Sequence, residues 1–174
     1  MSNIVDYMDW RGDLTLSQSP FNEIDNLLLA EVCFFDWRGI VPAFGAGEPL
    51  SLRAAVDNYQ LRRELSKIQM GLVVPAAIPA LVKKMAYSPR FEKVGLIGYV
   101  NEIDQKREIQ FSATTFLLPD ETVYVAFRGT DDTLVGWKED LNLAFMDEVP
   151  AQTAACAYLK QAAGILRGKF RIGG

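Results

Sequence analysis

The hydrophobic period of this sequence changes near Val94, and no other feature constrains the fold as strongly. Before Val94, apolar residues recur at the three- and four-residue spacing of helices. After it they alternate, largely on odd positions, as in half-buried strands: Ile97, Tyr99, Ile103, Ile109, Phe111, Ala113 and Leu117. A chain of 174 residues with this order suits a single α/β domain, with residues 1–92 mainly helical and residues 93–174 supplying strands and crossover helices.

The first half contains several helix signals. Ser19 followed by Pro20 is typical of a helix start, and the apolar spacing that follows predicts a helix over residues 20–35. Ser51 is placed to cap a second helix, with a further helical run through Leu65 and Ile68. The apolar segments 72–74 and 76–82 fit either a core helix or a lid-like or acyl-facing surface, and we favour the core helix.

The second half predicts a mixed sheet. The short polar segment 101–106 predicts that two antiparallel strands form a hairpin. The run Thr122–Phe127 is almost entirely β-branched and aromatic, as in a strand buried on both faces. Helices over about 133–145 and 151–163 follow, the second with Pro150 at its first position, and a strand begins at 170–172. Strand, helix, helix and strand in this order predict a parallel pair.

The amino-acid composition argues against several classes of function. The chain has no histidine, so it holds no Ser-His or Cys-His pair and no histidine metal ligand. A net charge of −4 with scattered signs argues against nucleic acid as a partner. Cys33 and Cys156 have apolar neighbours and are interpreted as reduced core residues. No apolar stretch is long enough to span a membrane, so we expect a cytoplasmic protein without cofactor or metal.

The segment Val123–Leu143 carries the chemistry. A buried strand that stops at Arg128-Gly129-Thr130 leaves a tight turn whose backbone N–H groups face the carboxyl edge of the sheet, where they can stabilise an oxyanion. The alternative is structural: Gly129 only turns the chain, and Arg128 pairs with a nearby carboxylate.

These residues also carry a family resemblance. The chain resembles the Mbeg1-like group of lipase-like α/β hydrolases, which is related to the class 3 lipases, most strongly from about residue 109 to 174. The matching motifs are Phe127-Arg128-Gly129-Thr130, Gly136-Trp137-Lys138-Glu139-Asp140-Leu141, Gln110-Phe111-Ser112-Ala113, Val149-Pro150-Ala151-Gln152, Pro20-Phe21-Asn22, Asp13 and Asp25. The resemblance implies an incomplete α/β-hydrolase-like mixed sheet preceded by a mainly helical N-terminal region.

The resemblance also assigns roles to residues. Thr130 would supply an oxyanion-hole N–H, with its hydroxyl as a second donor. Trp137 and Asp140 match positions that secure the following helix beneath the loop, and Arg128 is expected to pair with Asp140 or Asp132. Asp131 and Asp132 are interpreted as first-turn helix acids rather than metal ligands, because no histidine and no third carboxylate accompanies them.

The nucleophile elbow of this family, Gly-x-Ser-x-Gly, is missing, because none of the seven serines has glycine two places before and after it. The last residues resemble the strand that leads into the elbow, so nucleophile and histidine are expected beyond Gly174. The sequence therefore predicts the N-terminal portion of a lipase- or esterase-like serine acyl hydrolase, inactive by itself, whose full-length parent acts on an ester or lipid-like substrate. The alternative is a non-catalytic binding or assembly protein that keeps the hydrolase scaffold. In either case we expect a homo-oligomer formed through an exposed sheet edge.

Overall fold

The computed structural model describes residues 4–62, 75–104, 109–129 and 149–174. Several predicted features lie outside these ranges: the helical run through Leu65 and Ile68, the helix over 133–145 and part of the candidate site. Within the described ranges the fold is mixed α/β, as the change of period predicts. The helices are α1 (Ile4–Arg11), α2 (Glu23–Val32), α3 (Leu52–Arg62), α4 (Ile78–Ala86) and α6 (Pro150–Ile165).

The strands form one sheet in the order β1-β2-β3-β4-β5. They are β1 (Leu50–Ser51), β2 (Gly95–Asp104), β3 (Ile109–Leu117), β4 (Thr122–Phe127) and β5 (Lys169–Gly173). The first three pairings are antiparallel, which confirms the predicted hairpin of β2 and β3, and β4 pairs with β5 in parallel. The short strand β1, within the mainly helical region, was not predicted.

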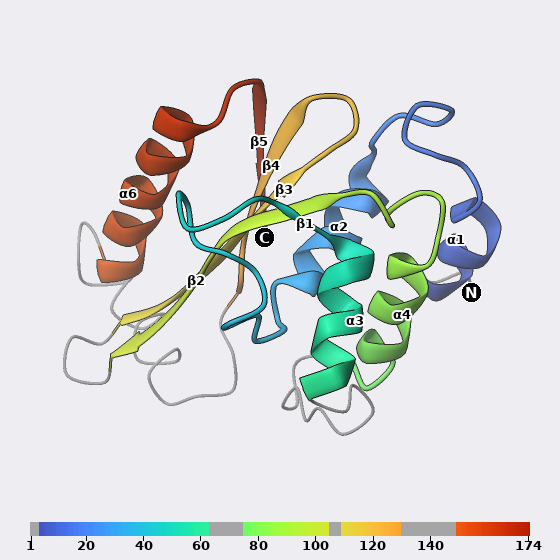
Figure 1. The fold of residues 1–174 in the computed structure, drawn as a ribbon, viewed down its shortest axis with the longest axis horizontal. Helices are drawn as coiled ribbons and strands as arrows, with labels where there is room; N and C mark the ends of the chain where they lie inside the picture. The colour runs from blue at the N-terminus through green and yellow to red at the C-terminus, as the bar shows by residue number, and fades with distance from the viewer. Residues whose placement is uncertain (1–3, 63–74, 105–108, 130–148) are drawn as a thin grey trace.

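Both faces of the sheet are covered. Figure 1 shows α6 on one side of the strands and the other helices on the opposite side. Two hydrophobic clusters follow from this arrangement. The helical-side core combines residues of α1 to α4 with Leu96, Phe116, Tyr124 and Ala126 of the sheet. The α6-side core contains Phe111, Ala113, Val123, Val125 and Tyr158. The strands β3 and β4 are therefore buried on both faces, as predicted for β4, whereas alternation predicted a half-buried β3.

A β-bulge in β2 changes which residues face which core. Ile97 pairs with Thr115 and Val100 with Ala113, so three steps on β2 match two on β3. Gly98, with φ of 72°, occupies the bulge, and a Cβ there would collide with the ring of Phe44. Its N–H donates to Pro42 O at 2.7 Å, and its carbonyl accepts from the Tyr158 hydroxyl at 2.8 Å. The bulge thus joins the loop before β1 to α6.

The helix α2 is shorter than predicted. It covers Glu23–Val32 rather than residues 20–35, because Asn22 and Asp25 form a capping box that sets its first turn. The Asn22 side chain accepts from the backbone N–H groups of Ile24 and Asp25, and the Asp25 carboxylate accepts from Asn22 N at 3.0 Å. This reciprocal cap satisfies three backbone donors, so it outweighs the signal at Ser19 and Pro20.

Two further helix predictions are confirmed. Ser51 caps α3, with its hydroxyl accepting from Ala54 N at 3.2 Å. The segment over 76–82 enters α4, which has Pro79 in its first turn and buries Ile78, Leu81 and Val82. It is a core helix and not a surface lid, whereas residues 72–74 lie outside the described residues.

A buried ion pair joins α2 and the loop before it to the segment between α4 and β2. The Arg90 guanidinium donates to both oxygens of the Asp25 carboxylate, at 2.7 and 2.5 Å, and both side chains are 0% exposed. Arg90 also donates to the carbonyls of Leu14 and Ser19 at 3.0 and 3.1 Å. The Tyr7 hydroxyl donates to Asp25 at 3.1 Å. Each polar group of the pair is thereby satisfied although it is removed from water.

The two cysteines differ. Cys33 is buried, as predicted, but Cys156 is exposed on α6, so its interpretation as a core residue is wrong. The cause is that α6 turns only one face to the sheet, through Tyr158 and Ala162, and alanine neighbours are compatible with either face. In the described part of the chain, no helix combines the length and the apolar character that crossing a membrane requires.

Candidate functional site

The candidate site begins where β4 ends. The last pairing of β4 joins Phe127 to Ala113, and the chain continues along β3 for one more residue, with Arg128 N donating to Ser112 O at 2.9 Å. Gly129, which follows, is exposed, and a Cβ at this position would meet nothing within 4 Å. The strand thus ends where the turn was predicted to begin, and crowding does not require a glycine at position 129; the turn itself lies outside the described residues.

Three of the predicted site residues, Thr130, Trp137 and Asp140, lie outside the described residues, and so do Asp131 and Asp132. The oxyanion role of Thr130 and the pairing of Arg128 with Asp140 or Asp132 stay predictions. The structure locates Arg128 and Gly129, both at the carboxyl edge of the sheet.

The end of β5 lies beside the end of β4. Ala126 is the β4 partner of Gly173, and a Cβ on Gly174 would collide with the carbonyl oxygen of Phe127. A Cβ on Gly173 would collide with the Asn26 side chain and the Tyr124 hydroxyl. Both glycines thus permit close packing of the chain where the two parallel strands end. The sequence predicted the strand but not this packing.

A buried polar group lies beneath the β4 end, on the helical side of the sheet. The Cys33 thiol donates to Ala126 O at 3.6 Å and to Leu29 O at 3.8 Å. Burial raises its pKa to about 12, although the positive charge of Arg128 acts in the opposite direction. The thiol is therefore protonated at neutral pH and is no nucleophile.

Tyr99 is a second titratable group within the electrostatic influence of Arg128. Burial raises the pKa of its hydroxyl to about 12, the Asp36 carboxylate contributes in the same direction, and Arg128 opposes it. The hydroxyl donates to Asp36 Oδ1 at 3.4 Å. Sequence reasoning did not identify Tyr99 or Asp36 as neighbours of Arg128. The only signal was Gly98, because a glycine inside a strand pattern indicates a bulge that turns the next residue to the other face.

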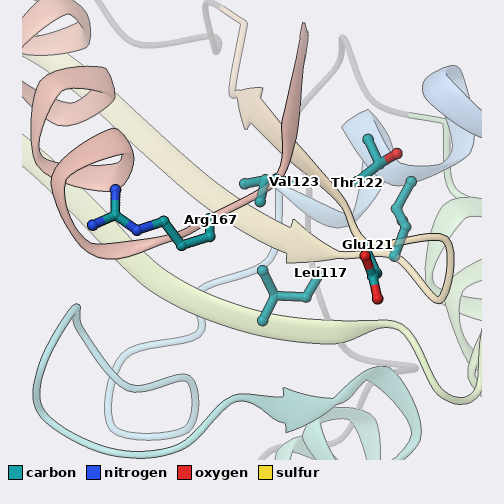
Figure 2. A pocket seen from close by; sticks show the side chains of 7 residues that line it. Leu117, Glu121, Thr122, Val123 and Arg167 are labelled. Atoms are coloured by element: carbon teal, nitrogen blue, oxygen red, sulfur yellow. The ribbon is translucent and has the colours of Figure 1, made fainter.

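An open pocket of about 380 Å³ lies at the opposite end of the same strands. Figure 2 shows Leu117 and Val123 forming its apolar part, with Glu121 and Arg167 at the sides. It lies at the β3–β4 turn, where Glu121 adopts a φ of 63°, and at the start of β5. Ligands of open α/β sheets bind at the carboxyl ends of the strands, whereas this pocket lies at the amino ends of β4 and β5. It is therefore separate from the candidate loop.

Comparisons with known proteins identify the family. The model of the Mbeg1-like family matches residues 85–174, which is more than half of the chain. The match includes β2 to β5, α6 and the whole candidate site. No curated protein and no solved structure matched the chain. The extent of the family match shows that the chain belongs to the Mbeg1-like family.

Proposed function

We propose that this chain carries the oxyanion loop of a serine acyl hydrolase of the lipase-like α/β-hydrolase class, which cleaves carboxylic esters of lipid-like character. In this proposal Thr130 donates its backbone N–H, and its hydroxyl, to the oxyanion of the tetrahedral intermediate. Arg128, Gly129, Trp137 and Asp140 hold the loop. The seryl nucleophile and the histidine base belong to a longer parent chain.

One observation carries the proposal: the parallel strands β4 and β5 end side by side at one edge of the sheet. The loop that follows Arg128 and a strand-to-helix turn that follows β5 would therefore be neighbours. A nucleophile on such a turn needs oxyanion donors about 3 Å from the reacting carbonyl oxygen, and in this proposal the loop that begins at the end of β4 supplies them.

In this proposal the oxyanion donors come from the loop after β4, and the nucleophile and base come from the longer parent chain. A serine hydroxyl attacks the ester carbonyl, a histidine takes its proton, and the negative charge that develops on the carbonyl oxygen is stabilised by preorganised N–H and O–H donors. Loss of one such donor costs about 10²–10³ in rate, whereas loss of nucleophile and base removes the covalent mechanism. The 174-residue chain has no histidine, so it is expected to have no turnover.

The first test uses the 174-residue chain itself, incubated with a short-chain nitrophenyl ester. We expect hydrolysis no faster than in buffer, and hydrolysis that scales with the concentration of purified chain would contradict the proposal. The second test is to read the coding sequence after Gly174. The proposal requires His-Ser-x-Gly-Gly there, and an unrelated sequence would refute it.

A longer chain that carries this motif allows a test of the loop. Thr130→Val removes the hydroxyl donor and should lower kcat by about 10² with little change in KM. Thr153→Val, on the exposed face of α6, is the matched control and should leave kcat unchanged. Equal activity of the two variants would exclude the hydroxyl from the oxyanion hole.

The second candidate function is a non-catalytic binding or assembly protein that retains the hydrolase scaffold. The observation that favours it is the complete absence of histidine from a chain whose fold is otherwise compatible with hydrolysis. The reading of the coding sequence separates the two candidates, because only the hydrolase requires the elbow motif.

A further inference from the structure

The pocket at the amino ends of β4 and β5 is a feature that the proposed chemistry does not use. Its volume of about 380 Å³ lies at the lower end of the range for small-molecule sites, about 300–1,000 Å³. Leu117 and Val123, which pair with each other across β3 and β4, give the pocket an apolar floor. Figure 2 shows Glu121 on one side of this floor and Arg167 on the other, with the Arg167 side chain extending toward α6. The pocket wall thus runs from an acid over apolar groups to a base.

The backbone at Glu121 does not favour the residue that stands there. Glu121 is the third residue of the hairpin loop 119–121, which is closed by Leu118 N donating to Thr122 O at 2.9 Å and by Glu121 N donating to Leu118 O at 3.1 Å. The third residue of such a loop is left-handed and is usually glycine, and Glu121 adopts a φ of 63°. The chain therefore carries a carboxylate beside the pocket at a position where glycine would be more stable, which points to a role for the carboxylate outside the fold.

The two walls of the pocket are held together through their backbones. Gly168, the residue after Arg167, adopts a φ of 129°, and a Cβ at this position would collide with the carbonyl oxygen of Glu121. The next residue along, Lys169, pairs with Thr122 in the parallel ladder of β4 and β5. The turn and the start of β5 therefore keep a fixed relative position, and a ligand that enters the pocket does not have to order it first.

The two charges at the pocket do not neutralise each other. Neither the Glu121 carboxylate nor the Arg167 guanidinium has an ion-pair or hydrogen-bond partner among the residues that the structure describes. A purely anionic ligand would be repelled by Glu121, and a purely cationic ligand would be repelled by Arg167. A ligand with opposite charges at its two ends and an apolar middle complements all three parts of the pocket.

We propose that this pocket binds a small linear zwitterion, an ω-amino carboxylate. Its ammonium group pairs with Glu121 and its carboxylate with Arg167, while the methylene chain lies on the apolar floor between them. A guanidinium binds a carboxylate through two parallel N–H donors, and the Arg167 side chain is long and exposed, so that its guanidinium can turn toward the ligand. The inference concerns a second site and is independent of the proposed acyl chemistry.

Titration of the 174-residue chain with ω-aminohexanoate, followed in two-dimensional amide NMR spectra, tests the ligand class. We expect saturable shifts confined to residues 117–123 and 167–169. Hexanoate and hexylamine have the same chain length but lack one charge each, and they should bind about fivefold more weakly, because an exposed ion pair contributes up to about that factor. Equal binding of the three compounds, or no saturable shift with ω-aminohexanoate, would overturn the proposal.

Substitutions at the two exposed charges test the site. Glu121→Gln and Arg167→Gln should each weaken the binding of ω-aminohexanoate about fivefold. Lys160→Gln, which removes an exposed charge on α6, is the matched control and should leave the binding unchanged. Glu121→Gly should raise the urea midpoint of unfolding and yet weaken the binding as much as Glu121→Gln, which separates the site from the fold. Unchanged binding in Glu121→Gln and Arg167→Gln would overturn the site.

Discussion

The buried pair of Arg90 and Asp25 makes the sharpest test of how the fold is held together. Replacing Arg90 by Met keeps most of the side-chain volume but removes the guanidinium, which donates twice to Asp25 and also to the carbonyls of Leu14 and Ser19. The Asp25 carboxylate, 0% exposed, would keep only neutral donors, chiefly Tyr7 and a backbone N–H. Leaving a buried charge without its partner costs about 3–5 kcal/mol, a large share of the stability of one domain.

The assay is urea unfolding followed by tryptophan fluorescence and circular dichroism. Arg90→Met should lower the free energy of unfolding by about 3–5 kcal/mol at constant m value. Lys84→Met is the matched control, because Lys84 pairs with Asp9 at the surface, and it should cost no more than about 1 kcal/mol. The double variant Asp25→Leu with Arg90→Met should recover part of the loss. A loss for Arg90→Met no greater than for Lys84→Met would refute the reasoning.

Three further predictions follow from the buried and strained positions. Because the pKa of Cys33 is raised in the folded state to about 12 from an ordinary value of 9.0, stability should be complete below about pH 9 and fall by about 1.4 kcal/mol per pH unit above it. The loss of stability should steepen above about pH 10, where Tyr99 ionises in the unfolded chain. In Cys33→Ala, urea midpoints measured over this pH range should no longer show the first part of that loss. An alkylating reagent at pH 8 should modify Cys156 within minutes and Cys33 only after unfolding, as peptide mass spectrometry can measure; equal labelling would contradict the burial of Cys33. Gly98→Ala should lose about 2 kcal/mol or more in thermal or urea unfolding, because the left-handed backbone and the packed ring leave no room for a Cβ, whereas Gly164→Ala, in open space on α6, should lose none.

Local chemistry made the strands and α6 predictable. The β-branched and aromatic residues over 122–127 favour a buried strand, and Pro150 can start a helix but not continue one. The start of α2 was less certain because two capping signals lie within four residues of each other. The sequence contains both, and only the reciprocal hydrogen bonds of Asn22 and Asp25 decide between them.

The long-range contacts could not be predicted from the sequence. Arg90 and Asp25 are 65 residues apart, and no local pattern connects them. The same holds for the candidate site: the end of β4 and the residues Arg128 and Gly129 were predicted in place, but Tyr99 and Asp36 reach that place only through the bulge at Gly98 and the end of α2. The roles of Thr130, Trp137 and Asp140 remain predictions.

The helical-side core has a consequence for how the family segment can be used. Its sheet residues, Leu96, Phe116 and Tyr124, are covered by helices that precede residue 85, where the family match begins. A fragment restricted to residues 85–174 would turn one whole face of its sheet to water, together with an arginine whose carboxylate partner is gone. The unit that folds is therefore larger than the segment that the family model matches, and α1 to α4 are obligatory for any experiment on the loop after β4.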